Sequence, residues 1–179
     1  MGLNGKAIEV ESDITTGLPN FLIVGLPDSS IKESKERVRV AILNSGYNFP
    51  PGRITVNLSP ADLKKEGTQL DLPIAISLLS SMGVITYPYD DYVFLGELSL
   101  AGKIVPIRGA LAMIISMREL GYKKFIIAEE NKDECAIIND VDILPFDNLN
   151  DIVSFLNKEK EVKPYQLDLH KIDNQVTYD

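Results

Sequence analysis

The chain has 179 residues, of which 45% are hydrophobic and 25% are charged, which is typical of one well-buried globular domain. Its formal net charge of −8 argues against a surface that is basic throughout and coats DNA by charge alone. No apolar run approaches the roughly 20 residues of a membrane span, so we expect no membrane contact. The single Cys135 excludes an internal disulfide and a thiol zinc site, and with no signal peptide visible it predicts a cytoplasmic protein.

The first third of the chain predicts two strands and a helix. Residues 5–14 alternate in the manner of a half-exposed strand, and the continuous apolar run 21–25 predicts a central strand buried on both faces. A helix is expected from Ser30 to about Ser45. Ser30 and Glu33 have the Ser-x-x-Glu spacing of a capping box, which would satisfy two backbone N–H groups at its start.

The stretch from Arg53 to Leu79 organises the rest of the chain. It opens with an alternating pattern that predicts a strand and closes with a helix that is apolar on almost every side. We expect Asp71 to be the N-cap of this helix and Pro73 to lie in its first turn. Between strand and helix runs a charged loop, pinned by Gly67, that collects polar groups at one place in the fold: Asp62, Lys64, Lys65 and Glu66.

The remaining elements alternate between strand and helix. Two apolar runs flank Ala101-Gly102 and predict a hairpin. The pattern predicts an α/β domain, residues 1–157, in which the hairpin makes the sheet mixed. Residues 158–179 lack a sustained period and are expected to be a linker or tail that docks on something outside this chain, and His170 within it is expected to be solvated. The other expected elements are strands at 92–95, 124–128 and 141–144 and helices at 109–121, 131–139 and 149–157.

Most enzymatic signatures are missing from the sequence. It contains no phosphate-binding loop of the Gly-x-x-x-x-Gly-Lys-Ser/Thr type, no dinucleotide fingerprint and no metal-ligand spacing. A serine–lysine dyad remains an alternative, since a desolvated lysine can activate a serine without histidine. Its candidate lysines, Lys64 and Lys65, lie in a hydrophilic loop where we expect them to be solvated. The candidate serines are Ser59, Ser77 and Ser80.

Several long motifs, in fixed order, resemble the N-terminal domain of the ComM/YifB family of bacterial AAA+ ATPases, which are often labelled magnesium-chelatase-like. The resemblance covers residues 5–157. The motifs are Val24-Gly-Leu-Pro-Asp28, Lys32-Glu-Ser-Lys-Glu-Arg-Val-Arg39, Pro50-Pro-Gly-Arg-Ile-Thr-Val-Asn-Leu-Ser-Pro-Ala-Asp-Leu-Lys-Lys-Glu-Gly67, Asp71-Leu-Pro-Ile-Ala75 and Gly96-Glu-Leu-Ser-Leu-Ala-Gly102.

This resemblance implies a fold like the Lon protease domain, of the ribosomal protein S5 domain 2 type, with a mixed sheet and packed helices. It places the Lon catalytic serine on Asp71 and the catalytic lysine near Leu111. Because neither residue can perform that role, the resemblance implies a protease-like fold without its chemistry. It also implies that ATP and Mg²⁺ are bound by a separate AAA+ module, so that no cofactor is expected in this chain.

ComM-like proteins are associated with hexamers that drive DNA branch migration during natural transformation. The resemblance therefore implies a non-catalytic domain that serves ring assembly, DNA engagement or both, and that partners the AAA+ module. The alternatives are a pure oligomerisation or partner-docking domain that never touches DNA, and a serine–lysine peptidase. If DNA is contacted, the expected contact set, each member of which could instead be an ordinary solvated charge, is Lys32, Lys35, Arg37, Arg39, Arg53, Lys64 and Lys65.

Overall fold

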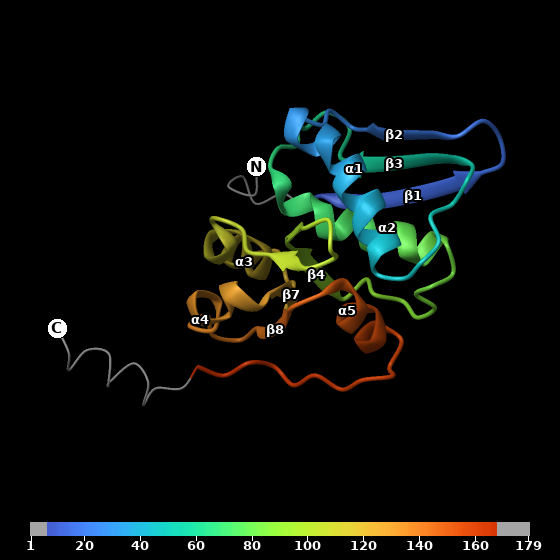
Figure 1. Cartoon of the computed structure of the whole chain (residues 1–179). Coiled ribbons are helices and arrows are strands. Elements are labelled where there is room, and N and C mark those ends of the chain that lie inside the picture. The colour runs from blue at the N-terminus through green and yellow to red at the C-terminus, as the bar shows by residue number, and fades with distance from the viewer. Residues whose placement is uncertain (1–6, 168–179) are drawn as a thin grey trace.

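The computed structural model describes residues 7–167, and the predicted tail residue His170 lies outside them. One sheet contains β1 (Glu9–Thr15), β3 (Arg53–Ser59) and β2 (Asn20–Val24) in that spatial order. It is mixed, because β1 is antiparallel and β2 parallel to the central β3. The helix α1 (Ser29–Asn44) connects the two parallel strands, and α2 (Asp71–Ser81) packs against β1 (Figure 1).

A second sheet is wholly parallel, with the order β4-β7-β8. Its strands are β4 (Tyr92–Leu95), β7 (Lys124–Ala128) and β8 (Asp142–Phe146), and Figure 1 shows it below the first sheet. The predicted hairpin, β5 (Glu97–Leu98) with β6 (Ile104–Val105), and two helices lie between these strands in sequence, and a third helix follows β8. These helices are α3 (Ala110–Glu119), α4 (Lys132–Cys135) and α5 (Leu149–Leu156), and short 3-10 turns, η2 (Thr68–Leu70) and η3 (Glu129–Asn131), precede α2 and α4.

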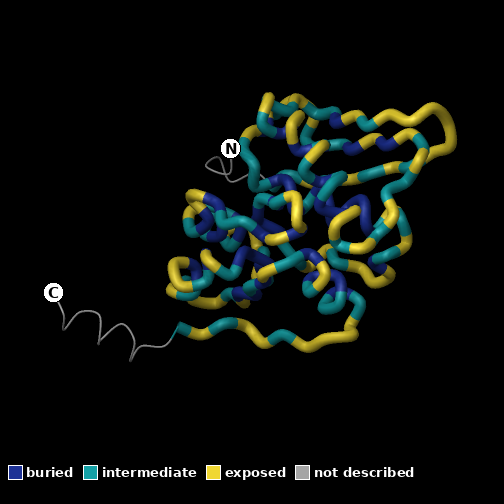
Figure 2. Tube along the Cα trace, viewed as in Figure 1, coloured by how far each residue is buried: buried dark blue, intermediate teal, exposed yellow. Residues whose placement is uncertain are grey.

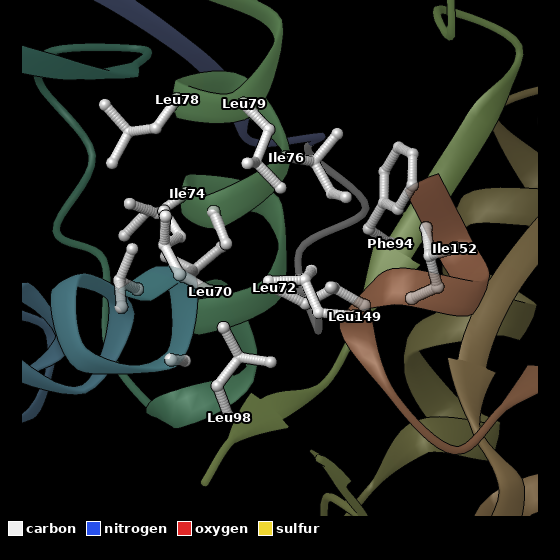
Figure 3. Close-up of a cluster of buried hydrophobic side chains, with 14 of the residues drawn as sticks. Leu70, Leu72, Ile74, Ile76, Leu78, Leu79, Phe94, Leu98, Leu149 and Ile152 are labelled. Atoms are coloured by element: carbon white, nitrogen blue, oxygen red, sulfur yellow. The ribbon is translucent and has the colours of Figure 1, made fainter. Parts of the chain in front are cut away.

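The helix α2 is the centre of the main hydrophobic core. It is buried almost continuously, which explains why its sequence is apolar on every side. Figure 3 shows Leu72 and Ile76 pointing toward Phe94 of β4 and Leu149 of α5, while Ile74 lies on the opposite side. Buried residues concentrate where α2 meets both sheets, whereas the β1–β2 connection is exposed (Figure 2).

The α/β class and nearly every element are confirmed, but the sheet arrangement differs from the prediction. The strand β2 is an edge strand rather than a central one, and Leu22 within it is 44% exposed. Only one face of β2 contributes to the hydrophobic core, through Ile23. The mixed character comes from β1 pairing with β3, because the β5–β6 hairpin forms a small sheet of its own.

Both predicted helix caps are wrong. Asp28, not Ser30, caps α1, and its carboxylate accepts the backbone N–H of Ile31 at 2.9 Å. Asp71 is the first residue of α2 and makes no capping bond, because η2 precedes it and its carboxylate is used elsewhere.

The start of the predicted tail docks on this domain rather than only on something outside it. The backbone N–H of Tyr165 donates to the carbonyl of Ile143 at 2.7 Å, and its hydroxyl bonds to Asp133 at 2.6 Å. Val162 packs against the main core. Residues 158–167 therefore form an extended strap along the domain, visible below β8 in Figure 1.

Candidate functional site

The first residue of α2 carries a buried ion pair. The side chain of Asp71 is 0% exposed, and its Oδ2 receives a hydrogen bond from Arg37 Nε at 2.8 Å. Arg37 Nη2 donates to Oδ1 at 3.1 Å, Ser34 Oγ also donates to Oδ1, and the backbone N–H of Leu98 donates to Oδ2 at 3.1 Å. Both carboxylate oxygens are thus bonded, by groups from α1 and the β5–β6 hairpin.

This arrangement follows from helical spacing. Ser34 and Arg37 are three residues apart, so both project from the same face of α1 toward the start of α2. The hydrogen bond to Asp71 is the main reason that the pKa of Arg37 is raised above its ordinary value. Arg37 is only 21% exposed and is held by this carboxylate, so it connects α1 to α2 rather than facing solvent freely.

Lys65 is buried, contrary to the expectation of a solvated loop lysine. Its Nζ donates to the carbonyl of Gly25 at 2.8 Å and to the carbonyl of Pro60. Loop 60–67 folds over the turn after β2, because Lys65 exchanges backbone hydrogen bonds of 3.0 Å with Leu26 and Asp28. Desolvation lowers the pKa of the Lys65 amine.

The dyad residues are not brought together. Within residues 7–167, the hydrogen bonds of the Lys65 amine go to the backbone carbonyls of Gly25 and Pro60 and to no serine hydroxyl. Ser77 Oγ instead donates to Ser12 Oγ at 2.8 Å, and Ser59 Oγ accepts from Asn57 at 3.4 Å.

The other candidate positions are also separate. Ser80 lies beside the phenol of Tyr89, and Lys64 is exposed on the loop. Leu111, at the position that the resemblance assigns to a lysine, is a partly exposed residue of α3.

The predicted basic contact set is spread over several surfaces. Lys32 and Lys64 are exposed, and Lys35 is partly exposed on α1. Lys64 lies near the carboxylate of Asp28, at the start of the same helix. Arg39 forms an exposed ion pair with Glu36.

Arg53 lies apart from these residues. It begins β3, so the length of this seven-residue strand, about 20 Å, separates it from the loop that carries Lys64. Thr15 of β1 lies opposite Arg53, and the exposed Asp13 is two residues from Thr15 on the same strand. Because Lys65 is buried, the members of the predicted set that solvent reaches at the start of α1 are the exposed Lys32 and Lys64 and the partly exposed Lys35.

Sequence reasoning missed a cleft between the two sheets. Its volume is about 430 Å³, and consecutive residues of two chain segments line it, 7–11 at and just before the start of β1 and 92–95 on β4. Leu70 and Pro73, which flank Asp71, complete one wall. No local signal could have revealed this cleft, because its walls are more than 80 residues apart in sequence.

Residues 7–167 contain neither a cluster of metal ligands nor a reactive thiol. Among the described residues, no group of three or more His, Cys, Asp or Glu side chains is placed to hold a metal ion. Cys135 is buried, and burial raises the pKa of its thiol to about 12. Across residues 7–167, no helix has the length and apolar character needed to cross a bilayer.

Comparison with known proteins places these features in a family. A family profile described as "Subunit ChlI of Mg-chelatase" matches residues 10–131. The chain is 43% identical to the YifB protein of Escherichia coli over 157 residues, which cover 87% of this chain and 31% of YifB. It is 35% identical to the competence protein ComM of Haemophilus influenzae over 163 residues, covering 90% of this chain and 32% of ComM.

A more distant match is the Lon protease of Trichlorobacter lovleyi, 23% identical over 163 residues that cover 84% of this chain and 20% of the protease. The chain thus spans about a third of the length of its YifB and ComM relatives. The resemblance found in the sequence motifs is confirmed: this chain belongs to the magnesium-chelatase-like family of subunit ChlI, in which YifB and ComM are its relatives.

Proposed function

We propose that this chain is a non-catalytic accessory domain of a ComM-like, ATP-driven motor that acts in DNA branch migration. The observation that carries the proposal is the state of Asp71. At the position where the resemblance places a nucleophilic serine, a carboxylate is buried and both its oxygens are bonded by Arg37, Ser34 and Leu98. Such a carboxylate holds elements together and has no free lone pair directed at a substrate.

The wider assembly belongs to the same proposal. A Lon-protease-like fold of the ribosomal protein S5 domain 2 type is supported by the distant Lon match and by the mixed β1-β3-β2 sheet. ATP and Mg²⁺ would be bound by an AAA+ module outside residues 1–179, in a cytoplasmic hexamer. The greater length of YifB and ComM leaves room for that module.

We place the DNA contact, if the domain makes one, at the start of α1. Lys32 and Lys64 are exposed there and Lys35 is partly exposed. Lys65 is excluded by its burial, and Arg37 is held by Asp71. A cluster of three lysines beside acidic neighbours fits phosphate contacts made within a larger ring, where several copies add their charges.

The DNA role is tested in a full-length ComM-like protein that carries this domain. Replacing Lys32, Lys35 and Lys64 by Glu should weaken binding to branched DNA and flatten its salt dependence, by on the order of one unit of slope for each lysine that touches phosphate. The control variant carries Glu at the exposed Lys123, Lys160 and Lys163. Equal binding by both variants and the parent protein at low and high salt would contradict the DNA role.

The absence of peptidase chemistry is tested on this chain alone. Incubated with unfolded, fluorescently labelled casein, it should release no more fluorescence than buffer. Cleavage that persists through purification and disappears in Lys65→Met would overturn the proposal, because a contaminating protease would not respond to that substitution.

A docking role without DNA contact is the second candidate, and the cleft between β1 and β4 favours it. Unlike DNA binding, docking on a protein partner does not require a positively charged surface, which agrees with the net charge of −8. It would be supported if the triple lysine variant kept full DNA affinity but a change in the cleft disrupted ring assembly.

A further inference from the structure

The walls of the cleft are the free edges of two sheets. Along its whole length β1 is paired with β3 on one side, and β4 is paired with β7 on one side. Within the described residues, neither strand has a partner strand on its other side. Because successive side chains of a strand point to opposite faces, the consecutive residues 9–11 of β1 and 92–95 of β4 can line one cleft only along the edges of their strands. Unpaired strand edges of this kind accept a further strand through main-chain hydrogen bonds.

The side chains of the cleft define the chemistry of an occupant. The inner wall is apolar and aromatic, with Leu70, Phe94 and Met117 among its residues. Glu9, Glu11 and Asp90 supply carboxylates, and within residues 7–167 the lining contains no lysine, arginine or histidine. An occupant that alternates apolar with basic residues would direct the apolar set toward the wall and the basic set toward these carboxylates.

We propose that this cleft binds an extended segment of a partner polypeptide, alternating apolar and basic residues, which pairs with β1 by strand addition. Such a strand would lie between β1 and β4 and would extend the β1-β3-β2 sheet toward the β4-β7-β8 sheet. It would also pass the start of α2, because Gln69, Leu70 and Pro73 line the same cleft. This inference is independent of DNA binding, since it uses the acidic side of the domain and not the lysines of α1.

The probe is a capped nine-residue peptide, Arg-Val-Arg-Val-Thr-Val-Arg-Val-Arg, titrated into the ¹⁵N-labelled 179-residue chain and followed by NMR. We expect saturable shifts in the amides of residues 7–11 and 92–95 and slower hydrogen exchange in β1. Two N-methylated forms, one at the four valines and one at the intervening residues, each lose the main-chain donors along one edge of the strand. The form that loses the edge facing β1 should not bind. A peptide with Glu in place of Arg should not bind either.

The protein side is tested by charge reversal. Glu9→Lys with Glu11→Lys should weaken binding of the basic peptide about ten-fold or more, since two favourable cross-strand charge pairs become repulsive. Both residues are exposed, so the double variant should fold normally. The control is Glu130→Lys with Glu161→Lys, which changes the net charge equally at exposed sites outside the cleft lining and should leave the affinity unchanged.

Three results would overturn the proposal. The first is no binding of the basic peptide at millimolar concentration, and the second is binding of both N-methylated forms with the affinity of the unmodified peptide. The third is a concentration-dependent dimer in which the β1 amides are already protected before peptide is added. That outcome would assign the cleft to a second copy of this chain.

Discussion

Asp71 shows how one side chain can join three elements. Its carboxylate binds Ser34 and Arg37 of α1 and the backbone of Leu98 in β5, while it begins α2 itself. A buried carboxylate requires such bonds because an unpaired charge in the interior is very unfavourable. The same bonds that make Asp71 structurally important also occupy the atoms that chemistry would need.

Asp71→Ala should lower the free energy of unfolding by about 3 kcal/mol, the low end for a broken buried pair, because Arg37 keeps some access to water. Urea denaturation followed by circular dichroism measures the loss. The matched control is Glu36→Ala, which breaks the exposed pair with Arg39 and should change stability little. Similar losses in the two variants would contradict the structural role of Asp71.

Lys65 should make stability depend on alkaline pH. Its folded pKa is below the unfolded value of 10.5, so between these two values the unfolded chain binds more protons and folding stability rises with pH. Tyr47 and Tyr89, whose pKa values burial raises, act in the opposite direction but are present in both proteins compared.

The prediction therefore concerns the difference in the free energy of unfolding between the wild type and Lys65→Met. Between neutral pH and 10.5, the free energy of unfolding of the wild type should rise relative to that of Lys65→Met. Urea titrations at several pH values measure both curves. Parallel curves would mean that the Lys65 amine keeps its ordinary pKa.

At the scale of elements, the turn after β2 fixes how loop 60–67 is placed. Gly25 has φ +106, and a Cβ there would lie 2.1 Å from the carbonyl oxygen of Leu58 in β3. The turn therefore lies directly against β3. Lys65 lies in the loop that follows β3, so its side chain can reach the carbonyl of Gly25. A side chain at residue 25 would push these two segments apart.

Gly25→Ala should destabilise the domain more than Gly46→Ala does. Both glycines have positive φ, which costs an alanine about 1 kcal/mol, but nothing lies within 4 Å of a Cβ at Gly46. The clash with Leu58 should add about 1–3 kcal/mol in the first variant alone. Thermal unfolding of both variants measures the difference, and equal melting temperatures would show that the turn can relax away from β3.

Tyr165 contributes to holding the strap of residues 158–167 against the domain. Tyr165→Ala removes the hydroxyl bond to Asp133 and the ring that lies 5.0 Å from Lys132 Nζ. We expect faster tryptic cleavage after Lys158 and Lys160, because the backbone there becomes easier to release. Tyr165→Phe keeps the ring and should be intermediate. Cleavage at the wild-type rate in both variants would show that Tyr165 does not hold the strap.

At the scale of the whole molecule, β7 joins two hydrophobic clusters into one cooperative unit. Phe125 and Ile127 face the cluster with Ile114 of α3, whereas Ile126 faces the main core with Ile74 of α2. A strand buried on both faces cannot leave one cluster without disrupting the other. The two sheets should therefore unfold together.

Ile74→Ala and Ile114→Ala, one in each cluster, should each lower the free energy of unfolding by about 2–5 kcal/mol within a single transition. Far-ultraviolet and tyrosine near-ultraviolet signals should coincide in both variants. The exposed Leu43→Ala serves as the neutral control. Two separate transitions, each shifted by only one variant, would show that the sheets fold independently.

Local patterns were enough to predict most of the fold and the family. The alternation in β3, the all-apolar residues of α2 and the β5–β6 turn depend on neighbours within a few positions, so periodicity and turn chemistry identify them. The order of the sequence motifs likewise identified the family. The resemblance alone placed Asp71 at the Lon serine position.

The sequence by itself therefore determined which elements form and to which family the chain belongs. Only the tertiary structure decided that Lys65 is buried, that β2 is an edge strand, and that β1 and β4 face each other across a cleft. The reason is distance along the chain. Asp71 binds partners 37 and 34 residues before it and 27 residues after it, and no local pattern specifies which charges or strand edges meet at such separations.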